Sequence, residues 1–209
     1  MMGFLTIAFV SYLIGSIPSG YLAGRLAGVD IRRQGSGNIG ATNVTRTLGK
    51  RYGYPVFLAD FCKGLSAILL APLLAPALAQ SHQPDVTQIV AGIFVVVGNA
   101  FPFWLRFRGG KGVATSAGLL FGLIPAAAVI VTLVWVIAFY TIRYVSLASV
   151  LGALALPLTV ILIARLTGTH RPLVLYISIA LAAIVILRHR SNLSRLMDGT
   201  EERLKRRED

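Results

Sequence analysis

The segment Val113–Ile142 reads VATSAGLLFGLIPAAAVIVTLVWVIAFYTI, which is 30 residues without a charged side chain. A membrane-spanning helix needs about 20 apolar residues, and soluble domains do not accumulate uncharged runs of this length. The segment therefore lies in a membrane. It crosses once, or it crosses twice with a turn near Leu123-Ile124-Pro125, and this choice decides the topology of the whole chain.

The rest of the chain has the same character. It has 209 residues, is 56% hydrophobic and has a mean hydropathy of +0.74. Four more uncharged runs occur, namely Met1–Gly24, Val86–Leu105, Tyr144–Ala164 and Pro172–Leu187. The first run lacks a basic segment before it and a small-residue cleavage site after it, so we read it as a retained helix and not as a signal peptide. The single cysteine, Cys62, excludes an internal disulfide and a cysteine zinc site.

Charge placement decides between one and two crossings. Basic loops stay on the cytoplasmic side of a membrane. A single crossing by Val113–Ile142 leaves only 12 of the 20 lysines and arginines inside, whereas a double crossing leaves 18 inside. The second alternative predicts an all-α polytopic membrane bundle of about seven segments, with the N-terminus outside and the C-terminus in the cytoplasm. Two crossings in 30 residues are short, so we expect one of them to be part-way.

Under this topology four polar motifs fall on the cytoplasmic side: Ser36–Asn43, Arg106–Gly112, Arg143–Ser146 and His189–Asn192. They come from four separate regions of the chain. We therefore expect residues 1–209 to form one domain with one shared site on the cytoplasmic face.

The loop Gln34–Asn43 is rich in glycine, hydroxyl and amide groups, contains no acid, and is flanked by arginines and lysines. A backbone that turns on glycines directs several N–H groups at one point, which suits a phosphate or an oxyanion. Gly35, Gly37 and Gly40 also spell the dinucleotide motif G-x-G-x-x-G, but no strand–helix–strand unit surrounds them. We therefore read the loop as a phosphate cradle at a membrane surface.

A second glycine-rich motif spans Asn99–Gly112. Its aromatic residues fit an interfacial belt, but a belt does not require three glycines around one lysine. The glycines would let the backbone approach a bound group while Lys111 supplies a compact charge. The alternative for Lys111 is a plain topological charge, and that alternative is the favoured one for Arg106. Gly112 stands where a nucleotide-binding P-loop has Ser or Thr, so we reject a nucleotide hydrolase.

These motifs resemble those of the acyl-phosphate-dependent glycerol-3-phosphate acyltransferases. The similar stretches are Gly15–Leu22, Ser36–Asn43, Phe107–Thr115, Tyr144–Ser149 and Arg188–Asn192, in the same order and spacing over nearly the whole chain. The resemblance implies a seven-helix enzyme of the bacterial inner membrane. Such an enzyme moves a fatty acyl group from acyl phosphate to the 1-position of glycerol 3-phosphate, giving lysophosphatidic acid and phosphate in phospholipid biosynthesis.

The chain departs from the family pattern at two positions. The family usually has His where Asn99 stands and Lys where Arg108 stands. Arg108 keeps the charge but changes its geometry. Asn99 cannot take up a proton at neutral pH, so we interpret it as a hydrogen-bonding residue that shapes the loop.

The residues and the resemblance together predict the site. The cradle for the acyl-phosphate phosphate is Ser36, Gly37, Asn38, Gly40, Thr42 and Asn43. Arg46, Lys111 and Ser146 would hold the phosphate of glycerol 3-phosphate or neutralise developing charge, with Arg108 and Gly110 as further substrate-binding residues. His189 and Asn192 would orient the attacking hydroxyl. We expect Lys111, Ser146, His189 and Asn192 to be catalytic.

Some roles stay open at this point. His189 is a general base, or it only orients the hydroxyl while a substrate phosphate oxygen takes the proton. Ser146 is alternatively a helix N-cap. Asp60 and Lys63, three residues apart, are expected to pair at a helix entrance.

The expected partners are acyl phosphate, glycerol 3-phosphate and the lipid bilayer, without nucleic acid, cofactor or metal; the sequence does not give the oligomeric state. The acyl phosphate is an activated mixed anhydride, so its transfer needs positioning and charge stabilisation more than a strong nucleophile. The alternative function is an organic-anion transporter or channel. A conduit should carry polar groups at mid-membrane, whereas these spans are apolar.

Overall fold

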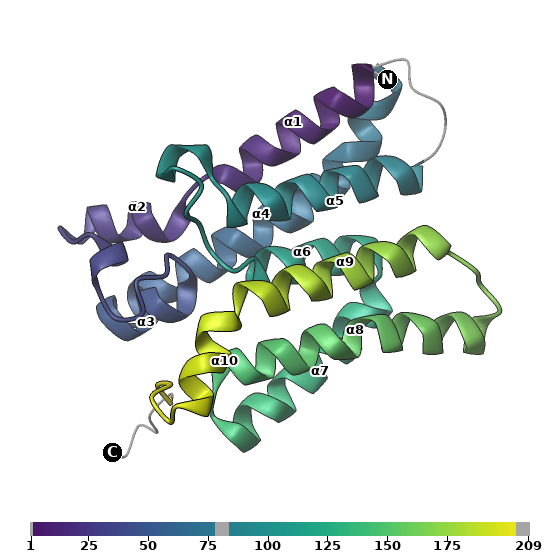
Figure 1. Ribbon diagram of the computed structural model, residues 1–209. Coiled ribbons are helices and arrows are strands. Elements are labelled where there is room, and N and C mark those ends of the chain that lie inside the picture. The colour runs from purple at the N-terminus through teal and green to yellow at the C-terminus, as the bar shows by residue number, and fades with distance from the viewer. Residues whose placement is uncertain (1, 78–83, 204–209) are drawn as a thin grey trace. The chain divides into compact units, whose positions relative to one another are not determined.

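The computed structural model describes residues 2–77 and 84–203, and within these ranges the chain is helical without a strand (Figure 1). The helices are α1 (Met2–Ser16), α2 (Ser19–Leu26), α3 (Ala41–Leu48), α4 (Lys50–Ala77), α5 (Pro84–Ala100), α6 (Val113–Leu123), α7 (Pro125–Ile142), α8 (Val145–Thr167), α9 (Pro172–Arg188) and α10 (Arg190–Met197), with short 3₁₀ turns at Ile31–Arg33 and Phe103–Leu105. The predicted all-α class is confirmed.

The chain divides into two compact units, residues 1–123 with α1 to α6 and residues 124–209 with α7 to α10. The boundary falls at Ile124, which the sequence predicted as the turn within the long apolar run. A single domain over residues 1–209 remains a prediction.

Small residues let the helices of the first unit approach closely. A Cβ atom on Gly15 of α1 would collide with the Val95 carbonyl of α5, and one on Gly118 of α6 would collide with the Phe61 carbonyl of α4. In a membrane, where lipid is as apolar as leucine, such close backbone packing is the main source of helix association. These contacts hold α1 against α5 and α4 against α6.

The break between α1 and α2 is stabilised by a buried ion pair. Pro18 lacks an N–H, and the carbonyl of Ile17 accepts a hydrogen bond from Lys63 Nζ at 2.5 Å. Lys63 Nζ also lies 2.6 Å from Asp60 Oδ1, and both residues are buried. The predicted Asp60–Lys63 pair is therefore confirmed, but it lies within α4 and not at a helix entrance. A polar group inside an apolar bundle requires such partners.

Within the described residues, five helical stretches are long and apolar enough to cross a membrane: Met2–Leu26, Lys50–Leu74, Asp85–Leu105, Pro125–Ile142 and Val145–Thr167. The pair α9 and α10, bent by 52°, would make a sixth. With 11 residues, α6 is about 16 Å long, which is too short for a bilayer core of about 30 Å. The predicted part-way crossing therefore corresponds to α6, and the count of seven and the orientation of the termini remain predictions.

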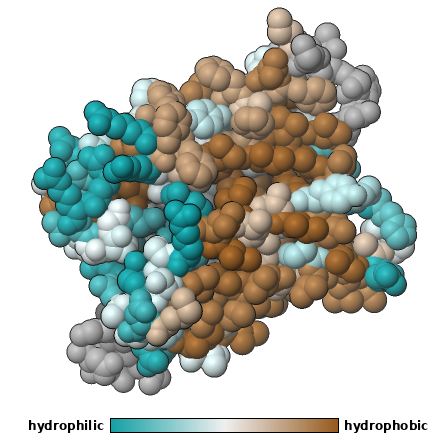
Figure 2. Space-filling model, in the orientation of Figure 1, coloured by the Kyte–Doolittle hydropathy of each residue, from teal (hydrophilic) through white to brown (hydrophobic). Residues whose placement is uncertain are grey.

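The surface agrees with a membrane protein. Figure 2 shows hydrophobic residues along the sides of the long helices, whereas hydrophilic residues gather around α2 and α3 in the first unit and near α10 in the second. Large apolar side chains such as Leu73 (71% exposed) and Ile137 (65% exposed) would be unfavourable in contact with water but fit a surface that faces lipid. Most of the loop 80–85, predicted to face outside, lies beyond the described residues, as does the end of the charged tail.

Candidate active site

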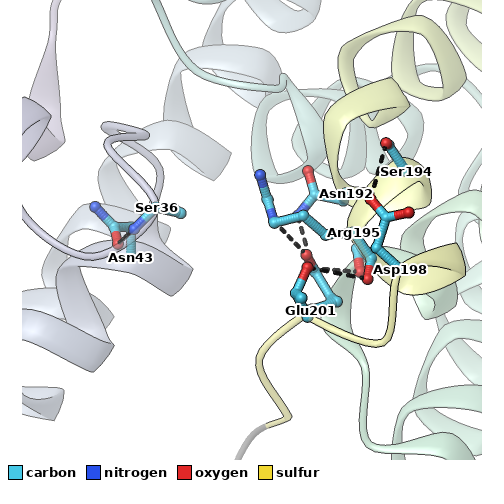
Figure 3. Close-up of polar contacts among 9 residues, drawn as sticks. Ser36, Asn43, Asn192, Ser194, Arg195, Asp198 and Glu201 are labelled. Atoms are coloured by element: carbon cyan, nitrogen blue, oxygen red, sulfur yellow. Dashed lines mark hydrogen bonds and ion pairs between the residues drawn. The ribbon is translucent and has the colours of Figure 1, made fainter.

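Asn43 organises the cradle loop of the first unit. Its Nδ2 donates hydrogen bonds to the carbonyls of Asn38 at 2.8 Å, Gln34 at 3.0 Å and Ile31 at 3.4 Å, and its Oδ1 accepts from the backbone N–H of Ser36 at 2.9 Å (Figure 3). Asn43 is 2% exposed, so these bonds satisfy a buried amide completely. The side chain therefore fixes the shape of the loop from behind.

The loop ends at the N-terminus of α3. The N-cap residue is Gly40, which has no side chain to bond the first N–H groups of the helix. Its own N–H donates to Asn38 Oδ1 at 2.7 Å. The first backbone N–H groups of a helix have no partner within the helix and attract anions. Thr42 and the half-buried Arg46 lie four residues apart on α3, so their side chains share one face. The helix start with the Thr42 hydroxyl suits a phosphate, and Arg46 of the last turn adds a positive charge on the same face.

The second glycine-rich loop folds back onto the end of α5. The N–H of Gly109 donates to the Ala100 carbonyl at 3.1 Å, and that of Gly110 donates to the Asn99 carbonyl at 2.9 Å. A Cβ atom on Gly109 would collide with the Asn99 carbonyl and with Pro102. Gly109 is therefore required for closing the loop. Asn99 holds this loop through its backbone carbonyl, and the predicted role of its side chain remains a prediction.

Two consecutive residues of the same loop have left-handed backbones, Arg106 (φ 52°) and Phe107 (φ 61°). Each costs about 1–2 kcal/mol for a residue with a Cβ atom. The backbone N–H of Arg106 donates a hydrogen bond to the Phe103 carbonyl, and that of Phe107 donates one to the Pro102 carbonyl. Gly112 (φ 78°) then turns the chain into α6, directly after the half-buried Lys111.

A small apolar cluster joins the two loops. Leu105 packs with Ile31, Ile39, Val44 and Val56, all of which are buried. The predicted convergence of the first two motifs is thereby observed within the first unit. Beside Leu105 the loops form an open pocket of about 500 Å³, which is lined by Arg32, Leu105, Arg106 and Arg108.

Arg32 of this pocket has a carboxylate partner. Its Nη2 lies 2.7 Å from Asp30 Oδ2, and its guanidinium stacks over the Tyr21 ring at 4.7 Å. The hydrogen bond from Arg32 lowers the pKa of Asp30 to about 2, so the aspartate stays ionised. Among the described residues no carboxylate pairs with Arg106 or Arg108. The pocket therefore keeps a positive balance.

The second unit contains a cluster that the sequence did not predict. Glu201 Oε1 accepts hydrogen bonds from Ser146 Oγ at 2.8 Å and Asn192 Nδ2 at 2.7 Å, and Oε2 accepts from Arg195 Nε at 2.9 Å (Figure 3). Burial alone would raise the pKa of Glu201, but the three hydrogen bonds outweigh it and the pKa is lowered. Two predicted catalytic residues from α8 and α10 are thus brought together by one ionised carboxylate.

His189 lies at the bend between α9 and α10 and is 3% exposed. Its Nδ1 is 2.8 Å from the Val185 carbonyl, which can only accept a hydrogen bond. Nδ1 therefore carries the proton in the neutral ring, and Nε2 keeps the lone pair. The N–H of Asn192 donates to the His189 carbonyl at 2.9 Å, so the two predicted residues belong to one turn.

The structure corrects one alternative and adds three residues. Tyr144 is the N-cap of α8, so the N-cap reading of Ser146 is wrong. Glu201 was missed because an acid in a charged tail looks like a solvated end. Arg32 and Arg106 were not predicted to line a pocket, because local sequence does not show which loops meet. It remains a prediction that the two motifs of the first unit form one site with the two motifs of the second unit.

Comparisons with known proteins point in one direction. The family described as glycerol-3-phosphate acyltransferase matches residues 5–199. A glycerol-3-phosphate acyltransferase of Geobacter sulfurreducens is 41% identical over 98% of this chain and 100% of its own length, and one of Aquifex aeolicus is 40% identical over 95% and 98%. A crystal structure of PlsY (YgiH), an integral membrane glycerol 3-phosphate acyltransferase in its glycerol 3-phosphate form, is similar with a TM-score of 0.83 and 40% identity, covering 97% of this chain and 96% of that one. Its lysophosphatidic acid form gives a TM-score of 0.81.

Proposed function

Because the chain belongs to the glycerol-3-phosphate acyltransferase family, a multi-pass membrane enzyme, we propose that its acyl donor is an acyl phosphate and that it forms 1-acyl-glycerol 3-phosphate. The 1-hydroxyl oxygen of glycerol 3-phosphate attacks the acyl carbonyl carbon, and the bond between that carbon and the phosphate oxygen breaks. The products are lysophosphatidic acid and inorganic phosphate. The proton of the hydroxyl passes to His189 or to a phosphate oxygen.

The observation that carries the proposal is the way the first unit presents its cations. Lys111 and Arg108 extend from a loop whose backbone is fixed by its own hydrogen bonds, and Arg46 extends from the last turn of the short helix α3. Fixed cations and N–H groups stabilise charge that develops on a phosphate leaving group without reorganising during the reaction. Such a site suits a donor that is already activated. The sequence contains no His-x-x-x-x-Asp, the acid–base pair of acyl-CoA-dependent transferases.

The cradle Ser36–Asn43 binds the phosphate of the donor through the helix start of α3. Gly37 and Gly40 keep the backbone accessible, and Asn38 and Asn43 hold the turn in shape through the bonds described above. Lys111, Arg108 and Arg46 hold the phosphate of glycerol 3-phosphate with Gly110 beside them.

In the second unit, His189 supports general-base chemistry through the lone pair on Nε2. Ser146 and Asn192 reach their positions through Glu201, which accepts a hydrogen bond from each. Their part in the reaction is to place the attacking hydroxyl, because Asn192 shares a turn with the candidate base and Ser146 is joined to Asn192 through Glu201. Glu201 is a positioning residue.

We place the enzyme in the inner membrane of a bacterium with its polar loops facing the cytoplasm. The support is the distribution of basic residues, of which 18 of 20 fall on one side under the double-crossing topology. The cytoplasm is also where glycerol 3-phosphate is available as a charged, membrane-impermeant substrate.

The proposal is tested by measuring phosphate release from acyl phosphate by the purified protein in detergent, with and without glycerol 3-phosphate. We expect release to depend on glycerol 3-phosphate and to match lysophosphatidic acid formation mole for mole. Absence of phosphate release, combined with uptake of an organic anion into vesicles, would instead indicate a transporter.

A further inference from the structure

The pocket between the two loops of the first unit contains two arginines, Arg32 and Arg106, that the proposed reaction does not use, beside Arg108, which it does. It holds about 500 Å³, and three of its four lining residues, Arg32, Arg106 and Arg108, are arginines. Asp30 neutralises Arg32 in part, so the excess positive charge comes from the other two. A guanidinium binds phosphate oxygens through a planar pair of N–H donors, which makes a phosphate ester the ligand class that fits this lining.

The pocket lies where two apolar spans end. The span Asp85–Leu105 stops one residue before Arg106, and the span Met2–Leu26 stops six residues before Arg32. Arg32 and Arg106, which follow these two spans, therefore lie at the level where the hydrocarbon core of the bilayer meets the headgroups. The phosphate of a lipid headgroup lies at that depth in a bilayer.

Two exposed aromatic residues are sequence neighbours of residues that line the pocket. Trp104 and Phe107 are each 61% exposed, and both adjoin a lining residue. The Trp104 ring lies against the Phe103 ring, with 3.8 Å between ring centres and 35° between the ring planes. Large rings at the water–hydrocarbon boundary anchor a protein among lipid headgroups. Leu105, between them, is buried and holds the segment to the loop core.

We propose that this pocket binds the phosphate of an anionic phospholipid headgroup in the surrounding bilayer, with Arg106 as its main ligand. Arg106 has no part in the proposed reaction, although its neighbour in the pocket, Arg108, does, and the proposal does not rest on the proposed donor. Its ligand chemistry, a phosphate ester oxyanion, is shared with soluble phosphate, and the test below separates the two sources.

The chain offers a built-in reporter for this site. It contains two tryptophans, so the Trp135→Phe variant leaves Trp104 as the only one. Trp135 donates to Ser149 Oγ at 3.1 Å, but Ser149 also donates to the Val145 carbonyl, so its hydroxyl keeps a partner in the variant. Nanodiscs of phosphatidylcholine receive a small mole fraction of either brominated phosphatidylglycerol or brominated phosphatidylcholine. Bromine quenches the fluorescence of a tryptophan that it approaches.

We expect brominated phosphatidylglycerol to quench Trp104 about fivefold more effectively, the enrichment that one arginine contact gives near a membrane. Arg106→Asn should remove the preference. Asparagine tolerates the left-handed backbone of this position, so the variant should fold at least as well. Arg51→Asn is the matched control, because Arg51 is an exposed arginine of the same unit outside the pocket, and it should keep the preference.

Four results would overturn the proposal. Equal quenching by both lipids would show that no selective site exists. An equal loss of preference in Arg51→Asn would show general surface charge. Displacement by added inorganic phosphate would assign the pocket to a soluble anion. A collapse of acyl transfer by Arg106→Asn in phosphatidylcholine alone would assign the pocket to the substrates.

Discussion

Two polar regions of this enzyme are held in place by different chemical groups. In the first unit a neutral amide, Asn43, holds the cradle by bonding three carbonyls and one N–H. In the second unit a carboxylate, Glu201, holds Ser146, Asn192 and Arg195. Both organisers are buried, but the partners of Asn43 lie within 12 positions of it, whereas Glu201 also reaches Ser146 across 55 positions.

The difference follows from what each region must present. A loop that binds anions loses affinity if a carboxylate lies beside it, and an amide can hold the turn without adding negative charge. Around Glu201 the organised groups are a hydroxyl, an amide and a guanidinium, all donors, which a carboxylate with two acceptor oxygens satisfies at once. The first region therefore keeps its positive potential, while the second depends on ionisation.

The largest effect is expected at the cation of the first region. Lys111→Ala should lower kcat/KM at least about 100-fold, the scale of losing one preorganised charge contact. Lys111→Arg should restore only part of it, because a planar guanidinium does not fit a point position between Gly110 and Gly112. Activity of correctly inserted, purified protein is the measurement. Arg165→Ala, an exposed arginine at the end of α8, is the control and should be nearly silent. Full turnover by Lys111→Ala would remove Lys111 from the site.

Next comes the organiser of the second region. Glu201→Ala leaves the hydrogen-bond donors of Ser146 and Asn192 buried without their acceptor, and should destabilise the protein by about 2–4 kcal/mol. Thermal unfolding in detergent measures this. Asp198→Asn changes an exposed carboxylate of the same tail, bonded only weakly to Ser194 at 3.5 Å, and should leave the unfolding temperature unchanged. Equal stability of both variants would show that the Glu201 cluster is not structural.

Asn43 gives the corresponding test of the neutral organiser. Asn43→Asp keeps an acceptor for the Ser36 N–H but places a carboxylate against three carbonyls, and Asn43→Ala removes every bond. We expect kcat/KM to fall about 10-fold or more in both, with Asn43→Asp at least as impaired as Asn43→Ala. Steady-state kinetics decide the order. An active Asn43→Asp would mean that charge at the cradle is harmless, and would break the contrast between the regions.

The contributions of the two regions to stability should also differ in their dependence on acidic pH. Because the pKa of Glu201 in the folded protein lies below its ordinary value of 4.5, an unfolded chain binds the proton more readily below that pH. The stabilisation by Glu201 is therefore complete above pH 4.5 and is lost as the pH falls through the lowered pKa. The difference in unfolding temperature between the wild type and Glu201→Gln should shrink on acidification over this range. A constant difference would show that ionisation of Glu201 is irrelevant to its role.

The smallest effect concerns Asn99. Its carbonyl holds Gly110, and any residue supplies a carbonyl, so Asn99→His should remain folded and active. Asn99→Leu should reduce activity by a few-fold through loss of a buried polar group at the loop, about 1 kcal/mol. The activities of the two variants, measured side by side, test this. Full activity of Asn99→Leu would confine the contribution of Asn99 to its backbone.

Much of the fold followed from the sequence for physical reasons. The apolar runs predicted the helices, because a backbone in lipid must satisfy its own hydrogen bonds. Leu123-Ile124-Pro125 predicted the break between α6 and α7, and the spacing of Asp60 and Lys63 predicted their pair. The length of α6 could not be assigned in advance, since hydropathy does not show where within 30 apolar residues a helix ends.

The site was predictable where chemistry is local and not where it depends on tertiary contact. Glycines, amides and cations next to one another indicated the cradle directly. That Asn43 supports the cradle from behind and that Gly109 closes a loop onto Asn99 depend on the fold of irregular loops, and that Glu201 reaches Ser146 across 55 positions depends on how distant segments pack. No local pattern carries such information.

The most direct test of the account compares acyl donors in one assay. Purified enzyme in detergent receives glycerol 3-phosphate with acyl phosphate, acyl-CoA or acyl carrier protein of the same chain length, and lysophosphatidic acid is quantified by mass spectrometry. The account predicts product from acyl phosphate alone, with one phosphate released for each product molecule. Product from acyl-CoA or acyl carrier protein without acyl phosphate would contradict it.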